Sequence, residues 1–175
     1  MALIGLSGAG KSAVAPLAAA RLGFPWIDLD QEIERAAGRS VADLFAEDGG
    51  ARFRALEAEA LQRALAPRRP GVVLACGGGI VTVPETRALL RSATFVIWLR
   101  VSPARALARL AAAGVAERPL LSGPEGAAGA IETMARERGS LYESSADAVI
   151  DTDGLSPDEV AERVASLCRP DPTWS

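Results

Sequence analysis

A glycine-rich stretch near the N-terminus constrains the fold more than any other part of this chain. Its sequence is GLSGAGKS at residues 5–12, between a short apolar run at 2–4 and an alanine-rich amphipathic segment that reaches residue 22. Gly, four residues and then Gly-Lys-Ser, placed between a strand and a helix, is the pattern of a phosphate-binding loop. The chain is therefore expected to begin an α/β fold with a site for a phosphorylated ligand.

Each part of this loop suits a polyphosphate. Glycines let successive backbone N–H groups point at one anion, and the start of the following helix adds a partial positive charge. Lys11 would neutralise the outer phosphate oxygens, and Ser12 would bind Mg²⁺. Lys11 is the only lysine in a chain with 19 basic residues, and a compact ammonium fits this position better than a broad arginine fork. The expected ATP-binding residues here are Gly8, Ala9, Gly10, Lys11, Ser12 and Ala13.

Hydrophobic periodicity predicts five short strands that alternate with helices. Apolar runs of strand length occur at 2–4, 26–29, 72–75, 95–99 and 148–150, with apolar residues at helical spacing between them. This alternation indicates a parallel sheet covered by helices on both faces, in a single domain of residues 1–175. Ser40 and Ser156 are each followed three positions later by an acidic residue and are expected to cap helices. Pro16 falls within the first expected helix, which it should kink or loosen.

Two segments lack this regularity. Residues 110–130 are rich in Gly and Ala, contain two prolines and are centred on Arg118. Because long irregular loops in compact domains are usually functional, residues at about 110–125 are expected to form a mobile lid, with a plain exposed connection as the alternative. The tail at 170–175 has no period and is expected to fray.

Composition narrows the classes of function. The net charge of -3 gives no general attraction to nucleic acid or anionic lipid. No apolar run is long enough for a membrane span, and a cytoplasmic protein is expected. Histidine is absent, which excludes Ser-His-Asp and Cys-His catalysis and leaves oxygen atoms as the ligands of any metal. Cys76 and Cys168 lack the spacing of a metal site and are expected to be buried free thiols.

A pair of carboxylates follows the second expected strand. Asp28 and Asp30 flank Leu29 at the carboxyl end of this strand, where open parallel sheets bind their ligands. In an extended strand, a spacing of two places both side chains on the same side. One carboxylate can face Mg²⁺ through water, and the other can accept the proton of a substrate hydroxyl during phosphoryl transfer. Turn or cap chemistry is the alternative, but the nearby phosphate loop favours a catalytic role.

Two further features suit a small acidic substrate. Arg54 and Glu57 lie one helical turn apart, so the carboxylate can orient the guanidinium for a contact with a substrate carboxylate. Spacing alone favours a simpler interpretation, a solvated surface pair. Gly77, Gly78 and Gly79 follow the third expected strand and would let a ligand approach the backbone closely. A plain tight turn is the alternative for these glycines.

These motifs, taken in order, resemble the shikimate kinase family from residue 2 to about residue 167. The matching elements are GLSGAGKS at 5–12, DLD at 28–30, GRSVADLFAEDGGARFRALE at 38–57, GGG at 77–79, RPLL at 118–121 and RGSLY at 138–142. The resemblance implies a five-stranded parallel sheet of the nucleoside monophosphate kinase type with a mobile lid. It also implies phosphorylation of the 3-hydroxyl of shikimate by ATP, by a protein expected to be a monomer.

The resemblance assigns roles to individual residues. The shikimate-binding residues would be Asp30, Arg54, Gly78 and Arg138, with Gly77 and Gly79 beside them. Arg118 would contact the phosphates of ATP, so the expected catalytic residues are Lys11, Asp30 and Arg118. The expected ligands of Mg²⁺ are Ser12 and Asp28. Three positions depart from the family pattern and are expected to tune nucleotide affinity: Ala13 where Thr is common, Gly50 where Glu is common, and Gly154 where a basic residue is common.

Two other functions stay open at this point. Another small-molecule kinase of the same fold, such as gluconate kinase, would share the phosphate loop but not the combination of Arg54, three glycines and Arg138. An inactive nucleotide-binding regulatory module is the second alternative, although an intact Lys11 with Asp28 and Asp30 argues against it. A GTPase is excluded, because guanine recognition there uses an Asn-Lys pair and the chain has no second lysine.

Overall fold

Five strands form one sheet in which all neighbouring strands are parallel. The computed structural model describes residues 1–66, 71–114 and 126–168. The strands, in the spatial order β2-β3-β1-β4-β5, are β1 (Ala2–Ile4), β2 (Trp26–Asp28), β3 (Val73–Ala75), β4 (Val96–Arg100) and β5 (Ala148–Asp151). Each lies within one residue of an expected run at either end. The predicted five-stranded parallel α/β fold is therefore confirmed.

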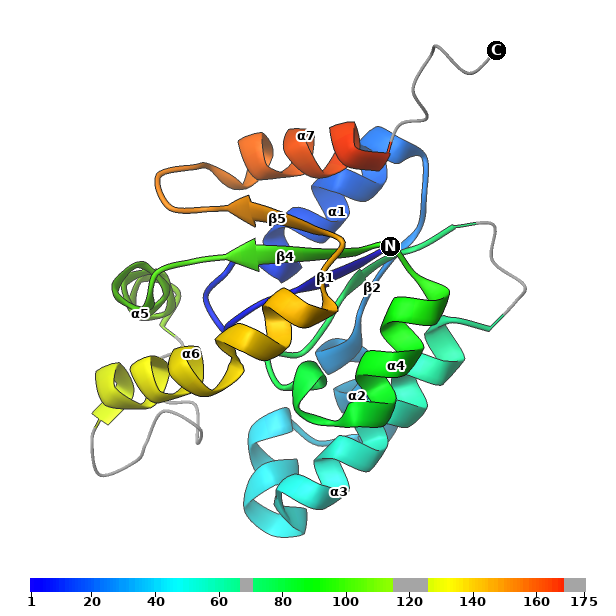
Figure 1. The fold of residues 1–175 in the computed structure, drawn as a ribbon. Coiled ribbons are helices and arrows are strands. Elements are labelled where there is room, and N and C mark those ends of the chain that lie inside the picture. The colour runs from blue at the N-terminus through cyan, green and yellow to red at the C-terminus, as the bar shows by residue number, and fades with distance from the viewer. Residues whose placement is uncertain (67–70, 115–125, 169–175) are drawn as a thin grey trace.

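Helices cover both faces of this sheet (Figure 1). They are α1 (Lys11–Leu22), α2 (Leu29–Ala37), α3 (Val41–Ala64), η1 (Ile80–Thr82, a 3₁₀ turn), α4 (Pro84–Ala93), α5 (Pro103–Ala112), α6 (Gly126–Ser145) and α7 (Pro157–Cys168). Helices α1 and α7 lie on one side of the sheet and α4 and α6 on the other. The inner strands β1 and β3 are consequently buried at every residue, as the expected covered sheet requires. Within the described ranges, no helix is both long and apolar enough to cross a membrane.

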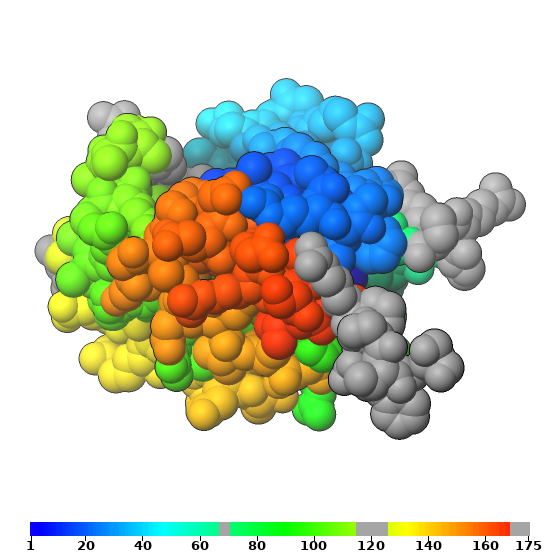
Figure 2. All heavy atoms as spheres, turned by 90° about the horizontal axis from the view of Figure 1, so that it is seen from above, coloured from blue at the N-terminus to red at the C-terminus, as the bar shows by residue number. Residues whose placement is uncertain are grey.

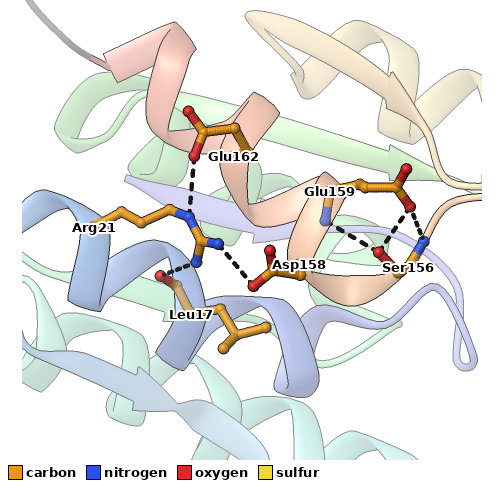
Figure 3. A network of polar contacts seen from close by, with 6 residues as sticks. All are labelled: Leu17, Arg21, Ser156, Asp158, Glu159 and Glu162. Atoms are coloured by element: carbon orange, nitrogen blue, oxygen red, sulfur yellow. Dashed lines mark hydrogen bonds and ion pairs between the residues drawn. The ribbon is translucent and has the colours of Figure 1, made fainter.

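An arginine on α1 fastens this helix to α7, which lies beside it (Figures 2 and 3). Arg21 donates to the carboxylates of Asp158, at 2.7 Å, and Glu162, at 3.1 Å. At the start of α7, the Ser156 hydroxyl accepts the backbone N–H of Glu159, whose carboxylate accepts the N–H of Ser156. This reciprocal pair is the predicted capping box. Because the acidic partners of Arg21 are largely exposed, the network orients the two helices more than it stabilises the fold.

The structure describes Pro16 and the first residues of the expected lid segment. The structure continues α1 through Pro16 without a break, so the proline removes one helical donor but does not end the helix. Helix α5 extends to Ala112, so the first residues of the expected lid, 110–112, are helical. Helix α6 begins at Gly126, directly after the last residue of the expected lid. The rest of that segment, including Arg118, and the tail at 170–175 lie outside the described residues.

The strand order gathers the predicted motifs at one edge of the sheet. From the central strand β1 the chain passes to β2 and β3 on one side, and it then crosses to β4 on the other side of β1. In open parallel sheets, ligands bind beyond the carboxyl ends of the strands where the order reverses. The loops after β1 and β3 and the junction of β2 with α2 meet at this edge, and they carry the glycine loop, the three glycines and the aspartates.

Candidate active site

A cavity of about 1020 Å³ lies at the carboxyl edge of the sheet. Its wall is formed by the loops after β1 and β3, by the start of α2, by parts of α3, α5 and α6, and by the connection from β5 to α7. The predicted residues that line it are Gly8, Ala9, Gly10, Lys11, Ser12, Ala13, Asp28, Asp30, Arg54, Gly77, Gly78, Gly79 and Arg138. The structure thus brings together the predicted site residues that fall within its described ranges.

The phosphate loop has a shape that its glycines make possible. Gly8 and Gly10 have φ angles of 82° and 95°, in the region that side chains other than glycine's rarely adopt. A Cβ on Gly8 would lie 2.6 Å from the backbone oxygen of Ala106, so α5 packs directly against the loop. Lys11, at the first position of α1, is 8% exposed and donates from Nζ to the carbonyls of Gly5, at 2.7 Å, and Leu6, at 2.8 Å. The ammonium is therefore already held within the loop at the end of β1.

Asp28 ends strand β2 and caps helix α2. Its Oδ1 accepts the backbone N–H groups of Asp30, at 3.0 Å, and Gln31, at 3.3 Å. Asp30 consequently lies in the first turn of α2 and not on a strand. The prediction that a strand period of two aligns both carboxylates was wrong in its geometry, and the alternative of a helix cap is confirmed for Asp28. Both residues nevertheless line the cavity, because the helix begins directly where the strand ends.

Arg54 and Glu57 form a buried pair, so the interpretation as a solvated surface pair was wrong. Arg54 Nη1 donates to Glu57 Oε2 at 2.5 Å, and the Glu57 side chain is fully buried while that of Arg54 is 19% exposed. The guanidinium carbon also lies 5.7 Å from the ring centroid of Phe45 and 5.4 Å from that of Phe53, within the range of cation–π attraction. One carboxylate and two aromatic rings thus fix the direction in which Arg54 faces the cavity.

Burial also changes the acidity of Glu57. Loss of solvent raises the pKa of its carboxyl above the ordinary value of 4.5, and the attraction of Arg54 opposes this rise. The folded protein therefore binds this proton more readily than the unfolded chain does. The carboxyl's contribution to stability is fully present below about pH 4.5 and is lost as the pH rises through the folded-state pKa.

The raised pKa of Glu57 predicts how the free energy of unfolding depends on pH. In urea unfolding experiments at a series of pH values, the free energy of unfolding of the wild type should fall relative to that of Glu57→Gln as the pH rises above about 4.5, because glutamine does not titrate. Glu59→Gln is the control, since Glu59 lies on the same helix, exposed and paired with Arg63. A constant difference between the wild type and Glu57→Gln across the series would contradict the raised pKa.

The three glycines after β3 permit close approach by the protein's own charged groups. A Cβ on Gly77 would lie 2.5 Å from Glu57 Oε1 and 2.8 Å from Asp30 Oδ1, and a Cβ on Gly79 would overlap the guanidinium of Arg54. Gly78 lies against the phosphate loop, where a Cβ would be 3.3 Å from the backbone nitrogen of Ser7. The three glycines do form a tight turn, closed by the hydrogen bond from the Ile80 N–H to the Gly77 carbonyl at 3.2 Å, and this turn packs closely against charged side chains of the cavity.

Two side chains of α6 donate hydrogen bonds to the carbonyl oxygen of Gly78. Arg138 Nη1 donates to this oxygen at 3.1 Å, and the hydroxyl of Tyr142, one helical turn further along, donates to it at 2.5 Å. The Tyr142 ring is buried and stacks on Trp98 of β4 with a centroid distance of 5.7 Å. Arg138 was predicted from the family resemblance, whereas Tyr142 was not given a role. It lies within the quoted RGSLY motif, but its spacing does not reveal a contact with a glycine so distant in sequence.

Arg109 on α5 is a second residue that the sequence did not reveal. Its guanidinium donates to the carbonyl of Thr152 at 2.6 Å and to the hydroxyl of the same residue at 3.0 Å. A longer contact of 3.4 Å reaches the carbonyl of Gly8. Loss of solvent lowers the pKa of Arg109 from its ordinary value. Arg109 therefore joins the β5–α7 connection to the phosphate loop.

The oxygen groups of the cavity suit a magnesium ion. The hydroxyl of Ser12 and the carboxylate of Asp28 both line it, and one oxygen of Asp28 is already used as the helix cap. Across the described ranges, no three His, Cys, Asp or Glu side chains gather as a metal site. Ser12 and Asp28 would be enough for Mg²⁺, which commonly takes one or two protein ligands and completes its shell with phosphate oxygens and water.

Comparison with known proteins identifies the family. The sequence profile of shikimate kinase matches residues 7–169. The chain belongs to the shikimate kinase family. The resemblance noted from the ordered motifs is thereby confirmed, and it extends over nearly the whole chain.

Individual family members are similar over almost their full length. A shikimate kinase from Symbiobacterium thermophilum is 44% identical over 166 residues, which cover 94% of each chain. The solved structure of a shikimate kinase from Acinetobacter baumannii in complex with shikimate superposes with a TM-score of 0.88 at 30% identity, covering 95% of this chain and 90% of that one. A gluconokinase from Sinorhizobium meliloti reaches a TM-score of 0.55 at 18% identity, covering 94% and 88% of the two chains, and shares the fold alone. The alternative of a gluconate kinase is therefore not favoured.

Proposed function

We propose that this chain transfers the γ-phosphoryl group of ATP to the 3-hydroxyl of shikimate, giving shikimate 3-phosphate and ADP. The observation that carries the proposal is the buried Arg54–Glu57 pair, which faces the same cavity as the phosphate loop. A phosphate loop by itself serves many reactions, whereas a fixed guanidinium beside it selects an acceptor with a carboxylate. Membership of the shikimate kinase family supports the same acceptor.

The acceptor half of the cavity matches the chemistry of shikimate, which has one carboxylate and three hydroxyl groups. Arg54 and Arg138 would bind the carboxylate, since planar guanidinium groups form paired hydrogen bonds with its two oxygens. Asp30, from the first turn of α2, would accept a hydrogen bond from the hydroxyl that reacts. The glycines at 77–79 would border the ring, because glycine leaves room there for Arg54 and for a ligand.

The donor half of the cavity would bind ATP. Backbone N–H groups of residues 8–13 and the N-terminal end of α1 would surround the β- and γ-phosphates. Ser12 and Asp28 would hold Mg²⁺, which when bound neutralises charge on the phosphate oxygens. Arg118, outside the described residues, stays a predicted contact of the phosphates.

Transfer in such a site depends on position and charge more than on a strong base. The hydroxyl oxygen of shikimate forms a bond to the γ-phosphorus while the bond to the leaving oxygen of ADP breaks. Asp30 accepts the hydroxyl proton, and Lys11 stabilises the negative charge on the transferred group and on ADP. A site with these two residues needs no histidine for this reaction.

Release of ADP from Mg-ATP, measured with and without shikimate, tests the proposal. We expect ADP release to depend on shikimate. Gluconate at the same concentration should not support it. Release with gluconate alone would indicate another small-molecule kinase. Nucleotide binding without release under any of these conditions would indicate the inactive module.

A glycine-to-alanine pair tests the contact between Gly79 and Arg54. Gly79→Ala should raise the Kd for shikimate by about tenfold or more, because the new methyl group displaces the guanidinium and removes a charge-assisted hydrogen bond. Gly139→Ala on α6 is the matched control, since a Cβ there meets no atom within 4 Å. Calorimetric titration with shikimate would measure both affinities. Equal affinities in the two variants would separate Gly79 from the acceptor site.

We also propose that the protein acts as a monomer in the cytoplasm. Cys76 and Cys168 are free thiols, one buried and one partly buried, and free thiols are typical of reducing compartments.

A further inference from the structure

The first turns of α3 form a segment that is set apart from the rest of the helix. We call residues 41–48 the short helix. It ends at Gly49, whose φ of 78° and ψ of 166° belong to a region open almost only to glycine. Leu44 is the one fully buried side chain that the described structure gives the short helix, and Val41 and Phe45 are partly buried against the core. So few apolar contacts are typical of a segment that opens easily.

The short helix supplies one side of the enclosure around Arg54. Phe45 reaches back across the Gly49 kink to Phe53, with ring centroids 4.5 Å apart. The guanidinium carbon of Arg54 lies 5.7 Å from the Phe45 centroid. If the short helix turns about the kink, Phe45 leaves and Arg54 loses one of the two rings that fix it. The orientation of the short helix therefore affects the group assigned to the substrate carboxylate.

Arg39 forms ion pairs with the end of the short helix. It lies between the end of α2 and the start of the short helix, and it donates from Nη1 to Glu47 at 2.6 Å and from Nη2 to Asp48 at 2.5 Å. Both carboxylates lie in the last turn before Gly49, where the helix dipole disfavours negative charge and a cation offsets it. One arginine thus connects the beginning of the short helix to its end.

We propose that Arg39 is a positioning residue for the acceptor site, which holds the short helix so that Phe45 stays against Arg54. The inference rests on the proposed function, because it takes the substrate carboxylate as the ligand of Arg54. Exposed ion pairs contribute little to global stability. The same pairs have a larger relative effect on a segment with little buried surface, since that segment opens independently of the rest of the fold.

Arg39→Gln tests this proposal, with Arg35→Gln as the matched control. Arg35 lies on α2, and its exposed side chain pairs with Glu32 of the same helix at 2.7 Å. None of the ion pairs described for Arg35 involves the short helix. We expect Arg39→Gln to raise the KM for shikimate about 2- to 10-fold, the effect of losing two exposed ion pairs, with kcat and the KM for ATP unchanged. Arg39→Lys should restore part of the loss, because an ammonium replaces one arm of the fork. Arg35→Gln should leave all three constants unchanged.

Hydrogen exchange gives a readout that does not depend on catalysis. Amides of residues 41–48 should exchange faster in Arg39→Gln than in the wild type and in Arg35→Gln, while amides of β1 and β3 keep their rates. Unchanged exchange in the short helix, or equal rises in KM for both substrates, would overturn the proposal. If the wild type releases no ADP in response to shikimate, the proposed function fails instead, and the exchange rates alone decide whether Arg39 holds the short helix.

Discussion

Replacement of Lys11 by alanine is expected to lower kcat by about two to three powers of ten. Loss of one group that stabilises charge in a transition state costs about 3 kcal/mol, which corresponds to this range. Lys11 is placed for such a role, because its ammonium is held by the carbonyls of the loop itself and has little exposure. Steady-state ADP release at saturating ATP and shikimate would measure the effect.

The control for this prediction is Lys11→Arg, which keeps the positive charge. We expect this variant to be impaired as well, since the arginine fork is too broad for the space that the glycine loop leaves. Circular dichroism would establish that both variants are folded. Full turnover in Lys11→Ala would contradict the catalytic role assigned to the only lysine of the chain.

Replacement of Arg54 by lysine is expected to weaken shikimate binding by about 1.5 to 3 kcal/mol and to leave ATP affinity nearly unchanged. A single ammonium cannot bind both oxygens of a carboxylate at once while it also pairs with Glu57. Because Arg54 is assigned to the acceptor half of the cavity, the effect should be confined to one substrate. Calorimetric titrations with shikimate and with a non-hydrolysable ATP analogue would separate the two affinities.

Arg52→Lys provides the matched control. Arg52 is exposed two residues earlier on the same helix, so the change is chemically identical but lies on the surface. Its affinity for shikimate should equal that of the wild type. Unchanged shikimate affinity in Arg54→Lys would remove Arg54 from the acceptor site and with it the main support for the proposed acceptor.

The sequence predicted those features that depend on neighbours along the chain. The glycine loop, the helix caps at Ser40 and Ser156 and the apolar runs each depend on residues that lie within a few positions of one another. Strand alternation then implied the parallel sheet, because crossover helices must cover its faces. This local information was sufficient to predict that the phosphate loop, the aspartates and the three glycines meet at one edge of the sheet.

The burial of individual side chains and the contacts between residues distant in sequence could not be predicted in this way. Spacing could not show that Glu57 is fully buried, because burial depends on what packs over α3 from elsewhere in the chain. The helix that begins at Leu29 replaced the expected end of a strand, since Asp28 caps the backbone there. Arg109 and Tyr142 reach partners far away in sequence, and nothing beside them distinguishes them from other arginines or from an ordinary core aromatic.

Gly78 has a consequence for how the two substrates would meet. Its backbone lies against Ser7 of the phosphate loop on one side, and its carbonyl is bound by Arg138 and Tyr142 on the other. The backbone of Gly78 thus borders the phosphate loop on one side and residues assigned to the acceptor on the other, within a single cavity. Transfer needs the γ-phosphorus and the acceptor hydroxyl in direct contact, and a methyl group on residue 78 would press on the backbone of Ser7 and shift the groups that bring them together.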